Sequence, residues 1–464
     1  MMNPVLLIDF GSTFTKVTAV DLDSEELLGT AKSFTTINTN VMDGLKKALD
    51  NLQQETGLRS EVYQRKLACS SAAGGLKMVA VGLVTDLTAE AARRAALGAG
   101  AKVLGTYAYQ LCENDLQDIE KNYPDIILLA GGTDGGDRKT ILHNANMLTR
   151  LCKDTPFVVA GNKTVAREVA DILSARHSYV VVTDNVLPEL NRLSVEPARN
   201  AIRQVFLDKI VEAKGLTQAE EFTEKVTMPT PAAVLKAAEL LAEGLGDEPG
   251  LGELVLVDIG GATTDVHSIG TGDPTQPGVN LKGLPEPYAK RTVEGDLGMR
   301  YSAVTLGEAA GARLAKVLNK PLAHVLESLK GLLNRPDSLP KGPEEIALDL
   351  AMGKMCTKLA VERHVGQIET VYTPFGASYI QWGKDLTQAK TLIGTGGVLV
   401  HCESPGEILQ ASLYDQTEPT LLSPKNPEIL LDEAYILSGI GLLAEISPEV
   451  ALRIAKKYLK RVYQ

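Results

Sequence analysis

Two short segments of the sequence place aspartate, glycine and hydroxyl residues in the same order. Asp9–Lys16 reads Asp-Phe-Gly-Ser-Thr-Phe-Thr-Lys, and Asp258–Asp265 reads Asp-Ile-Gly-Gly-Ala-Thr-Thr-Asp. Glycines let the backbone approach an anion closely, and successive amide groups in a turn can bind phosphate. The flanking carboxylates suit a magnesium ion held through water. Each segment predicts a phosphate-binding turn, although either one alone could equally be an ordinary hairpin with solvated carboxylates.

The elements around both segments predict β-hairpins. An apolar run precedes each aspartate, and an alternating run follows each turn, as expected for two antiparallel strands. The expected phosphate-binding residues are therefore the turn residues and their neighbours: Gly11, Ser12, Thr13, Thr15, Lys16, Gly260, Gly261, Ala262 and Thr263. Asp9 and Asp258 are the expected magnesium ligands, and Asp9, Asp258 and Asp265 are the carboxylates expected to take part in catalysis.

The remaining sequence predicts an α/β protein of several domains. The 464 residues allow two to four domains. Strands alternate with helices between about Glu61 and Ser194, which predicts a parallel sheet inserted after the first hairpin. A glycine-rich turn at Gly131–Gly136 follows one of these strands. It could bind an anion at a helix N-terminus or serve only as a tight turn.

Composition excludes several classes of function. There are 47 basic and 58 acidic residues, giving a formal net charge of −11, which disfavours nucleic acid or an anionic membrane as partner. No apolar run approaches the roughly 20 residues that span a bilayer, and the N-terminus lacks a signal-peptide pattern. The five cysteines are scattered without a CxxC pair, which favours reduced cysteines and a cytoplasmic protein.

Five blocks of the sequence, in order, resemble the ATPase pattern of actin, the sugar kinases and the heat-shock chaperones. They are the phosphate segments Asp9–Lys16 and Asp258–Asp265, the adenosine segment Ile393–Gly397, and the connecting segments Pro231–Ala237 and Asp432–Gly439. The resemblance implies two duplicated actin-like domains facing a nucleotide cleft, with ATP or ADP and Mg²⁺ as cofactors. It adds Gly394, Gly396 and Gly397 to the expected nucleotide-binding residues.

The resemblance also implies domain boundaries. Residues 1–60 would form domain I with the first hairpin, and residues 61–194 the inserted Rossmann-like α/β domain. Residues 195–250 would complete domain I and contain the first connecting helix. Residues 251–430 would form domain II, and residues 431–464 the second connecting helix and a C-terminal helix.

More narrowly, three segments and the Gly394–Gly397 turn are similar to the accessory protein of cobalamin-dependent glutamate (methylaspartate) mutase. The segments are Asp9–Lys16, Ala130–Gly136 and Arg291–Arg300, the last of which contains Glu294 and Gly295, two further expected nucleotide contacts. This family is often labelled MutL, a name shared with an unrelated mismatch-repair protein. It implies an ATP-dependent partner that reactivates or assembles the mutase, so mutase subunits are the expected partners. The oligomeric state stays open.

One departure from the chaperone pattern concerns hydrolysis. Chaperones of this superfamily place a glutamate before the proline of the first connecting segment, where this sequence has Thr230. The third glycine of the second turn is replaced by Ala262. We therefore expect slow, Mg-dependent ATP hydrolysis that acts as a switch. A small-molecule kinase of the same superfamily and a non-hydrolysing, nucleotide-gated scaffold are the alternatives.

The segment Asp265–Gly270 matches the Asp-x-His-x-x-Gly loop with which some mutases bind cobalt. That loop must follow a strand of a parallel sheet, whereas His267 lies in the second strand of the predicted phosphate hairpin. We therefore interpret the match as coincidence.

Overall fold

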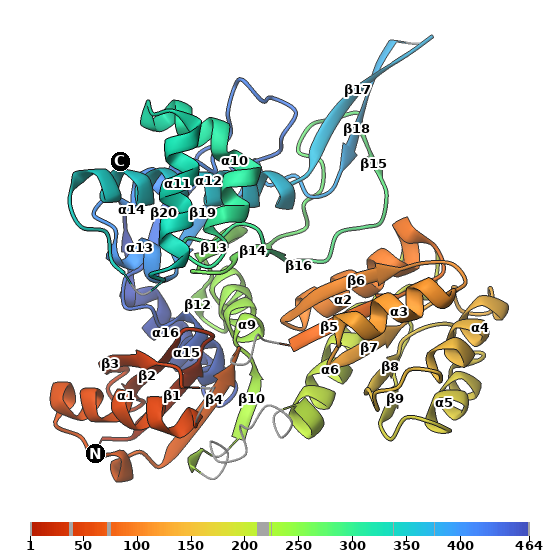
Figure 1. The fold of residues 1–464 in the computed structure, drawn as a ribbon, viewed down its shortest axis with the longest axis horizontal. Helices are drawn as coiled ribbons and strands as arrows, with labels where there is room; N and C mark the ends of the chain where they lie inside the picture. The colour runs from red at the N-terminus through yellow and green to blue at the C-terminus, as the bar shows by residue number, and fades with distance from the viewer. Residues whose placement is uncertain are drawn as a thin grey trace. The chain divides into compact units, whose positions relative to one another are not determined.

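The structure is a computed structural model that describes residues 2–36, 40–71, 76–210, 222–223, 225–336, 338–374 and 376–462. The chain divides into two compact units. Unit 1 comprises Met1–Lys236, Gly283–Pro287 and Ser438–Ala451, and unit 2 comprises Ala237–Lys282, Tyr288–Leu437 and Leu452–Gln464. Both units combine sheets with helices, so the predicted mixed α/β class is confirmed (Figure 1).

The first sheet of unit 1 has the strand order β10-β4-β1-β2-β3. Its central strand β1 (Pro4–Phe10) is buried at every residue, as expected for a continuous apolar run. β1 is antiparallel to β2 (Phe14–Asp21), and β2 is antiparallel to β3 (Glu26–Phe34). On its other side β1 is parallel to β4 (Arg65–Ser70), which is parallel to β10 (Lys225–Pro229). The first predicted phosphate turn therefore joins β1 and β2.

Helix α1 (Val41–Thr56) covers one face of this sheet. The Asn40 side chain accepts a hydrogen bond from the Met42 amide at its start, and Gly57, with φ of +73°, ends it. Leu45, Ala48 and Leu52 of α1 join a core with the inward residues of β1 and β2. The short 3-10 helix η1 (Ser60–Val62) leads on to β4.

A second sheet of unit 1 consists of five parallel strands in the order β6-β5-β7-β8-β9. In the chain it lies between β4 and β10 of the first sheet. Its strands are β5 (Leu76–Val81), β6 (Ala101–Tyr107), β7 (Ile126–Leu129), β8 (Phe157–Val159) and β9 (Val180–Val182). The helical segments that alternate with or follow them are η3 (Thr85–Ala89), α2 (Glu90–Gly98), α3 (Glu113–Asn122), α4 (Lys139–Leu148), α5 (Ala166–Ser174), α6 (Glu196–Val205) and η4 (Phe206–Ile210).

Both faces of this parallel sheet are covered. Val79 and Ile127 form a core with residues of α3, α4 and α5. Met78 and Leu128, which alternate with them, belong to the core that contains the buried alanines of α2. Strands covered on both faces are continuous apolar runs, and their alternation with helices is the pattern from which the sequence predicted a parallel sheet here.

The domain boundaries differ from the prediction at both ends of this region. β4 lies within the predicted inserted domain, but it pairs with β1 and β10 of the first sheet. Helix α6 lies after the predicted end at Ser194, but it packs against α2, β8 and β9. A short apolar run predicts a strand without indicating which sheet it joins, so the sequence could not place these elements.

The main sheet of unit 2 has the order β16-β14-β13-β19-β20-β21. Its strands are β13 (Leu254–Ile259), β14 (Thr264–Ile269), β16 (Ala289–Glu294), β19 (Thr391–Thr395), β20 (Glu428–Asp432) and β21 (Leu459–Arg461). β13 and β14 form the second predicted hairpin, and β13, β19 and β20 run parallel. β16 pairs antiparallel with β14 on the other side of the hairpin.

Helices and two smaller sheets complete unit 2. One face of the main sheet packs against α12 (Pro343–His364), α10 (Ala303–Leu318) packs against α12, and α11 (Leu322–Leu333) packs against α10. β15 (Val279–Lys282), β18 (Gly376–Trp382) and β17 (Gln367–Thr373) form a three-stranded sheet, and β11 (Gly244–Leu245) and β12 (Glu248–Pro249) form a short hairpin. The short helices are α13 (Gly397–His401) and α14 (Pro405–Gln410).

The first predicted connecting segment, Pro231–Ala237, lies within a helix, and the second, Asp432–Gly439, spans the end of a strand and the start of another helix. α9 (Thr230–Glu243) begins directly after β10, and the division between the units falls inside it, between Lys236 and Ala237. α15 (Leu437–Leu443) and α16 (Pro448–Tyr458) follow β20. The second connecting segment was predicted as helix from Asp432, but Asp432 ends β20 and the helix begins at Leu437. Within the described ranges, no helix is long and apolar enough to cross a membrane.

Candidate phosphate-binding turns

The first turn, Gly11–Thr13, has its carbonyl groups fixed by surrounding donors. The Ser71 amide donates to Phe10 O at 2.9 Å, the Thr35 hydroxyl to Gly11 O at 2.8 Å, and the Thr35 amide to Thr13 O at 2.9 Å. Across the residues that the structure describes, the Ser12 and Thr13 amides make no hydrogen bond. A turn with anchored carbonyls and two available amides suits an anion.

Gly11 is required by the close approach of this turn to its own strand. Its amide donates to Phe14 O at 3.0 Å, and a Cβ added to it would lie 2.5 Å from the same oxygen. Thr15 is fully buried and its hydroxyl lies 3.1 Å from that of Thr35. The Thr15 side chain therefore supports the turn from behind and is not placed to contact a ligand.

Asp9, at the end of β1, is surrounded by donors from three other elements. The Thr230 hydroxyl donates to Asp9 Oδ1 at 2.6 Å, and the Ser438 hydroxyl donates to Oδ2 at 3.0 Å. Lys16 Nζ lies 2.7 Å from Oδ2. The neighbouring Cys69 is buried, and this burial, followed by the charge of Asp9, raises the pKa of its thiol. Asp9 is thus the centre of a polar cluster that joins β1, β2, α9 and α15.

The second turn, Gly260–Thr263, is anchored in the same way by the segment that follows β16. The Met299 amide donates to Gly260 O, the Ser302 hydroxyl donates to Ala262 O, and Gly261 O accepts hydrogen bonds from two successive amides, those of Arg300 and Tyr301. The Gly261, Ala262 and Thr263 amides make no hydrogen bond within the described part of the chain. Both predicted turns therefore present amides whose hydrogen atoms are available to a ligand.

Asp258 and Asp265 lie directly opposite each other on β13 and β14. Opposed like charges destabilise a strand pair, and Arg291 on β16 offsets this repulsion. Its guanidinium lies 2.6 Å from Asp265 Oδ1, and both side chains are almost fully buried. Asp265 is therefore held in a buried ion pair, while Asp258 is only partly buried.

Glu294 and Gly295 lie beside the second turn, but both already accept hydrogen bonds from other residues of the protein. The Glu294 carboxylate accepts a 2.6 Å hydrogen bond from Arg363, which also binds Asp296. Gly295 O accepts from the Ser302 hydroxyl at 2.9 Å. The segment from Glu294 to Ser302 thus braces the turn, which is a supporting role that the sequence motif alone did not reveal.

The three glycines of the expected adenosine segment have different surroundings. Gly396 has φ of +102°, and a Cβ there would lie 2.4 Å from Ile259 O and 2.7 Å from Asp258 Oδ1. Gly394 is buried in β19, where a Cβ would meet Leu409 at 2.7 Å. Gly397 has no atom within 4 Å of its added Cβ. Gly396 is thus required where β19 meets the carboxylate of Asp258, and Gly394 is required by core packing.

The described residues suit a magnesium ion that binds together with a nucleotide, and not one held by the protein alone. No group of three or more histidine, cysteine or acidic residues able to hold a metal occurs among the described residues. Magnesium in nucleotide sites keeps several waters and needs only one or two carboxylates together with phosphate oxygens. Asp258 suits that role. Asp9 would take the same role once Lys16 left the Asp9 carboxylate and bound a phosphate instead.

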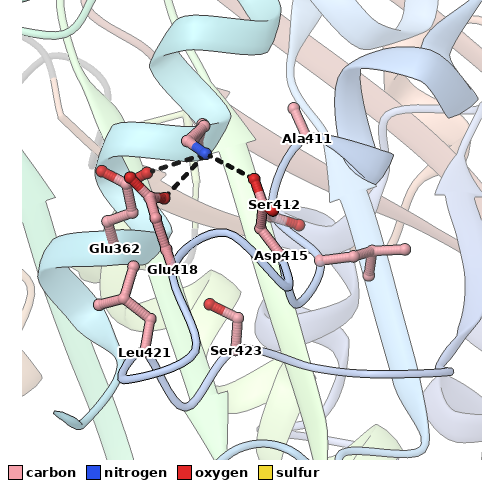
Figure 2. Close-up of a pocket in the computed structure, with 9 residues that line it drawn as sticks. Glu362, Ala411, Ser412, Asp415, Glu418, Leu421 and Ser423 are labelled. Carbon is pink, nitrogen blue, oxygen red and sulfur yellow. Dashed lines mark hydrogen bonds and ion pairs between the residues drawn. The ribbon is translucent and has the colours of Figure 1, made fainter.

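Two other features are less suited to an anion. In the glycine-rich turn Gly131–Gly136, the amides of Asp134, Gly135 and Gly136 donate to Pro188 O, Asn162 Oδ1 and Thr133 O. These bonds favour the tight-turn interpretation, because the amides are already used. A pocket in unit 2 is lined by Glu362, Asp415 and Glu418, which are labelled in Figure 2 and whose carboxylates all form ion pairs with Lys358.

His267 is buried in β14, as expected for a strand residue, and the pKa of its ring is held well below the ordinary value by burial and then by Arg291. On the other face of β14, His364 of α12 contacts the Ser268 and Thr292 hydroxyls at 2.8 Å each. The location of His267 in a strand supports the interpretation of the cobalt-loop match as coincidence.

A sequence profile described as MutL protein matches residues 5–459. Protein MutL of Clostridium tetanomorphum is 55% identical over 462 residues, which cover 99% of this chain and 100% of that protein.

Similar solved structures are more distant. Acetone carboxylase without nucleotide is 14% identical with a TM-score of 0.43, over 96% of this chain and 70% of that one. The 2-hydroxyisocaproyl-CoA dehydratase activator of Clostridium difficile with ADPNP is 10% identical with a TM-score of 0.33, over 100% of both chains. These low values support no further conclusion. Because the profile and the MutL relative both extend over almost the whole sequence, the chain belongs to the MutL protein family, which confirms the predicted family.

Proposed function

We propose that this protein is an ATP-binding accessory protein that reactivates or assembles a cobalamin-dependent glutamate mutase. The observation that carries the proposal is the pair of turns, Gly11–Thr13 and Gly260–Thr263, which have anchored carbonyls and available amides. Each turn would bind phosphates of one Mg-nucleotide. Membership of the MutL family supports the mutase as the partner.

The two halves would be duplicated actin-like domains. The proposal is supported by the matching strand orders β10-β4-β1-β2-β3 and β20-β19-β13-β14-β16, in which the relative strand directions are also the same. In this correspondence Asp9 matches Asp258, and each aspartate is the second-last residue of its strand, β1 or β13. A repeated element that carries an aspartate and an anion-binding turn suits a single nucleotide held by both.

Hydrolysis would be slow. Thr230 occupies the position where the related chaperones carry a glutamate, and its hydroxyl donates to Asp9. A hydroxyl held in this way cannot act as a general base. We therefore propose a nucleotide-dependent switch in which binding and release of nucleotide, more than rapid turnover, control the partner.

Partner binding is proposed for the parallel sheet of unit 1. The loops at the carboxyl ends of its strands expose Tyr109 (60%) and Leu190 (69%). Asn162 and Asn185 brace the same edge through hydrogen bonds to the loop after β7. Rigid loops at this edge of a parallel sheet are the usual place for binding.

The experiment is capture of purified mutase subunits by the tagged protein with ATP, with ADP and without nucleotide. We expect retention to differ at least about fivefold between nucleotide states, the lower end of typical coupling. Tyr109→Ser with Leu190→Ser should lose capture and keep nucleotide binding. Tyr123→Ser is the matched control, because Tyr123 is 68% exposed but precedes β7 at the opposite edge.

Two results would contradict the proposal. Capture that is the same in all three nucleotide states would remove the switch. Stoichiometric phosphorylation of a sugar or organic acid would instead establish the alternative kinase function on this scaffold.

A further inference from the structure

Three charged residues form a row across the first sheet beside the Gly11–Thr13 turn. Asp9 on β1 is the register partner of Lys16 on β2, and Lys16 is the register partner of Lys32 on β3. Directly opposed residues project from the same face of a sheet. The row therefore places one carboxylate and two ammonium groups side by side, with an excess of positive charge.

The row lies on the face opposite to helix α1. The residues of β1 and β2 that alternate with Asp9 and Lys16, among them Ile8 and Val17, form the core with α1. On the face of the row, Leu7 and Thr18 are the side chains nearest to Gly439 of α15. Asp9 is itself bound by the Ser438 hydroxyl from the same helix. This is the face on which the Asp9 cluster is built.

Aromatic contacts hold Lys32 near the turn. Phe14, the first residue after Gly11–Thr13, stacks on Phe34 of β3 with ring centroids 4.7 Å apart. Lys32 Nζ lies 5.3 Å from the centroid of Phe14. The Lys32 ammonium group therefore lies beside Phe14, the first residue after the turn.

Two opposed lysines are unfavourable in the absence of an anion. Like charges directly opposite each other on neighbouring strands destabilise the pair. Lys32 is exposed, but partial desolvation of its ammonium group, and then the charge of Lys16, lower its pKa. Lys16 Nζ lies 2.7 Å from Asp9 Oδ2, and an anion beside the turn would be attracted by both ammonium groups.

The corresponding row of the second hairpin has the opposite character. There the register partners are Asp258 and Asp265, two carboxylates. A phosphate would need a metal ion to approach them, whereas it could approach the first row directly. The two hairpins thus differ in the chemistry that they offer to one polyphosphate.

We infer that Lys32 is a second phosphate-binding residue, which acts with Lys16 to bind the polyphosphate chain of the nucleotide at the first hairpin. The inference deepens the proposed function and rests on phosphate binding at this turn. Nothing in the sequence motif Asp9–Lys16 indicates Lys32, because Lys32 lies on the following strand and reaches the row only through the β2–β3 register.

The test is calorimetric titration of the wild type, Lys32→Gln and Lys32→Arg with Mg-ATP and with inorganic tripolyphosphate. Lys32→Gln should weaken both affinities about tenfold or more, since a hydrogen bond to a charged group is lost, and Lys32→Arg should stay within about threefold. Lys47→Gln is the matched control, because Lys47 is exposed on α1, which covers the other face.

The melting temperature without ligand separates binding from a structural role. Lys32→Gln relieves repulsion, so its melting temperature should lie within about 2 °C of the wild type or above it. Unchanged affinities in Lys32→Gln would overturn the inference while leaving the proposed function intact. Tripolyphosphate binding that depends on Lys32, without any ATP binding, would keep Lys32 as a phosphate-binding residue but overturn the nucleotide as its ligand and, with it, the proposed function. A wild type that binds neither ligand would overturn both.

Discussion

The Thr230 hydroxyl donates a 2.6 Å hydrogen bond to Asp9 Oδ1 across 221 positions of the sequence. This bond joins Thr230, the first residue of α9, to the buried carboxylate of Asp9 in β1. In the proposed function, Thr230 and Asp9 occupy the two sites at which a metal-bound nucleotide and its attacking water would be oriented. Their direct contact gives a physical reason for slow hydrolysis, because the hydroxyl is engaged in supporting the carboxylate.

Replacing Thr230 with Val removes this hydroxyl and keeps the side-chain shape. Asp9 would lose one of its donors inside a buried cluster, so we expect a loss of about 1–3 kcal/mol in the free energy of unfolding. Urea denaturation measures it. Thr230→Ser retains the donor and should lose less than half as much. Equal losses in the two variants would show that the methyl group, not the hydrogen bond, stabilises the cluster.

Gly396→Ala should be strongly unfavourable. The added methyl would lie within 2.7 Å of both Ile259 O and Asp258 Oδ1, at a positive φ that alanine rarely adopts. We expect about 2 kcal/mol or more of destabilisation and a weaker Mg-ATP affinity. Gly397→Ala is the matched control, with open space around its added Cβ. Near-equal stability of the two variants would mean that β19 does not approach Asp258 as described.

Arg291→Met should destabilise unit 2 much more than Arg363→Met. The first change leaves Asp265 as an uncompensated, mostly buried carboxylate opposite Asp258, which costs about 3 kcal/mol or more. Arg363 pairs with Glu294 and Asp296, but its side chain is 39% exposed, so the second change should cost less than about 1 kcal/mol. Denaturation midpoints compare them. A larger effect of Arg363→Met would contradict the assignment of Arg291 as the main compensating charge.

Acid should destabilise the protein through two buried histidines. Burial, followed by neighbouring positive charges, lowers the pKa of His267 and His364 well below 6.5. The unfolded chain therefore binds more protons below pH 6.5, so their contribution to stability is complete above that pH and is lost as the pH falls. The expected slope is about 1.4 kcal/mol per pH unit for each histidine.

Denaturation between pH 7 and 5 tests this dependence. His364→Gln should reduce the slope by about half, since one of the two groups is removed. His324→Gln on the exposed side of α11 is the control and should leave the slope unchanged. A slope that is the same in the wild type and in His364→Gln would show that other groups cause the acid sensitivity.

Local patterns predicted the hairpins and the parallel sheet because these depend on nearby residues. Asp9, its turn and β2 lie within 18 consecutive residues of one antiparallel pair, and their alternation and glycines are visible directly. The hydrogen-bond donors to this turn and to Asp9 include Thr35, Thr230 and Ser438. These residues are distant in sequence and have no special spacing. Such partners follow from tertiary packing, as does the pairing of β4 with β1. A motif match could not indicate them.

The family motif gave partial information about the second turn. The segment Arg291–Arg300 supplied Glu294 and Gly295 as expected nucleotide contacts, but a sequence does not distinguish a side chain that contacts a ligand from one that braces the turn. The structure pairs Arg291 with Asp265 and Glu294 with Arg363. Gly394 was likewise expected to contact adenosine, whereas its hydrogen faces Leu399 and Leu409 in the core.

Calorimetric titration with ATP tests the central claim most directly, with and without magnesium, for the wild type, Asp9→Asn and Asp258→Asn. Asparagine keeps one acceptor oxygen for one of the Thr230 and Ser438 hydroxyls, and its Nδ2 can donate to the other hydroxyl, so Asp9→Asn should stay folded. The wild type should bind one ATP in a magnesium-dependent manner, and each variant should bind it about tenfold more weakly, because each loses an anionic contact to the hydrated ion. Mg-ATP affinity that is unchanged in both variants would contradict the assignment of the two hairpins to one nucleotide.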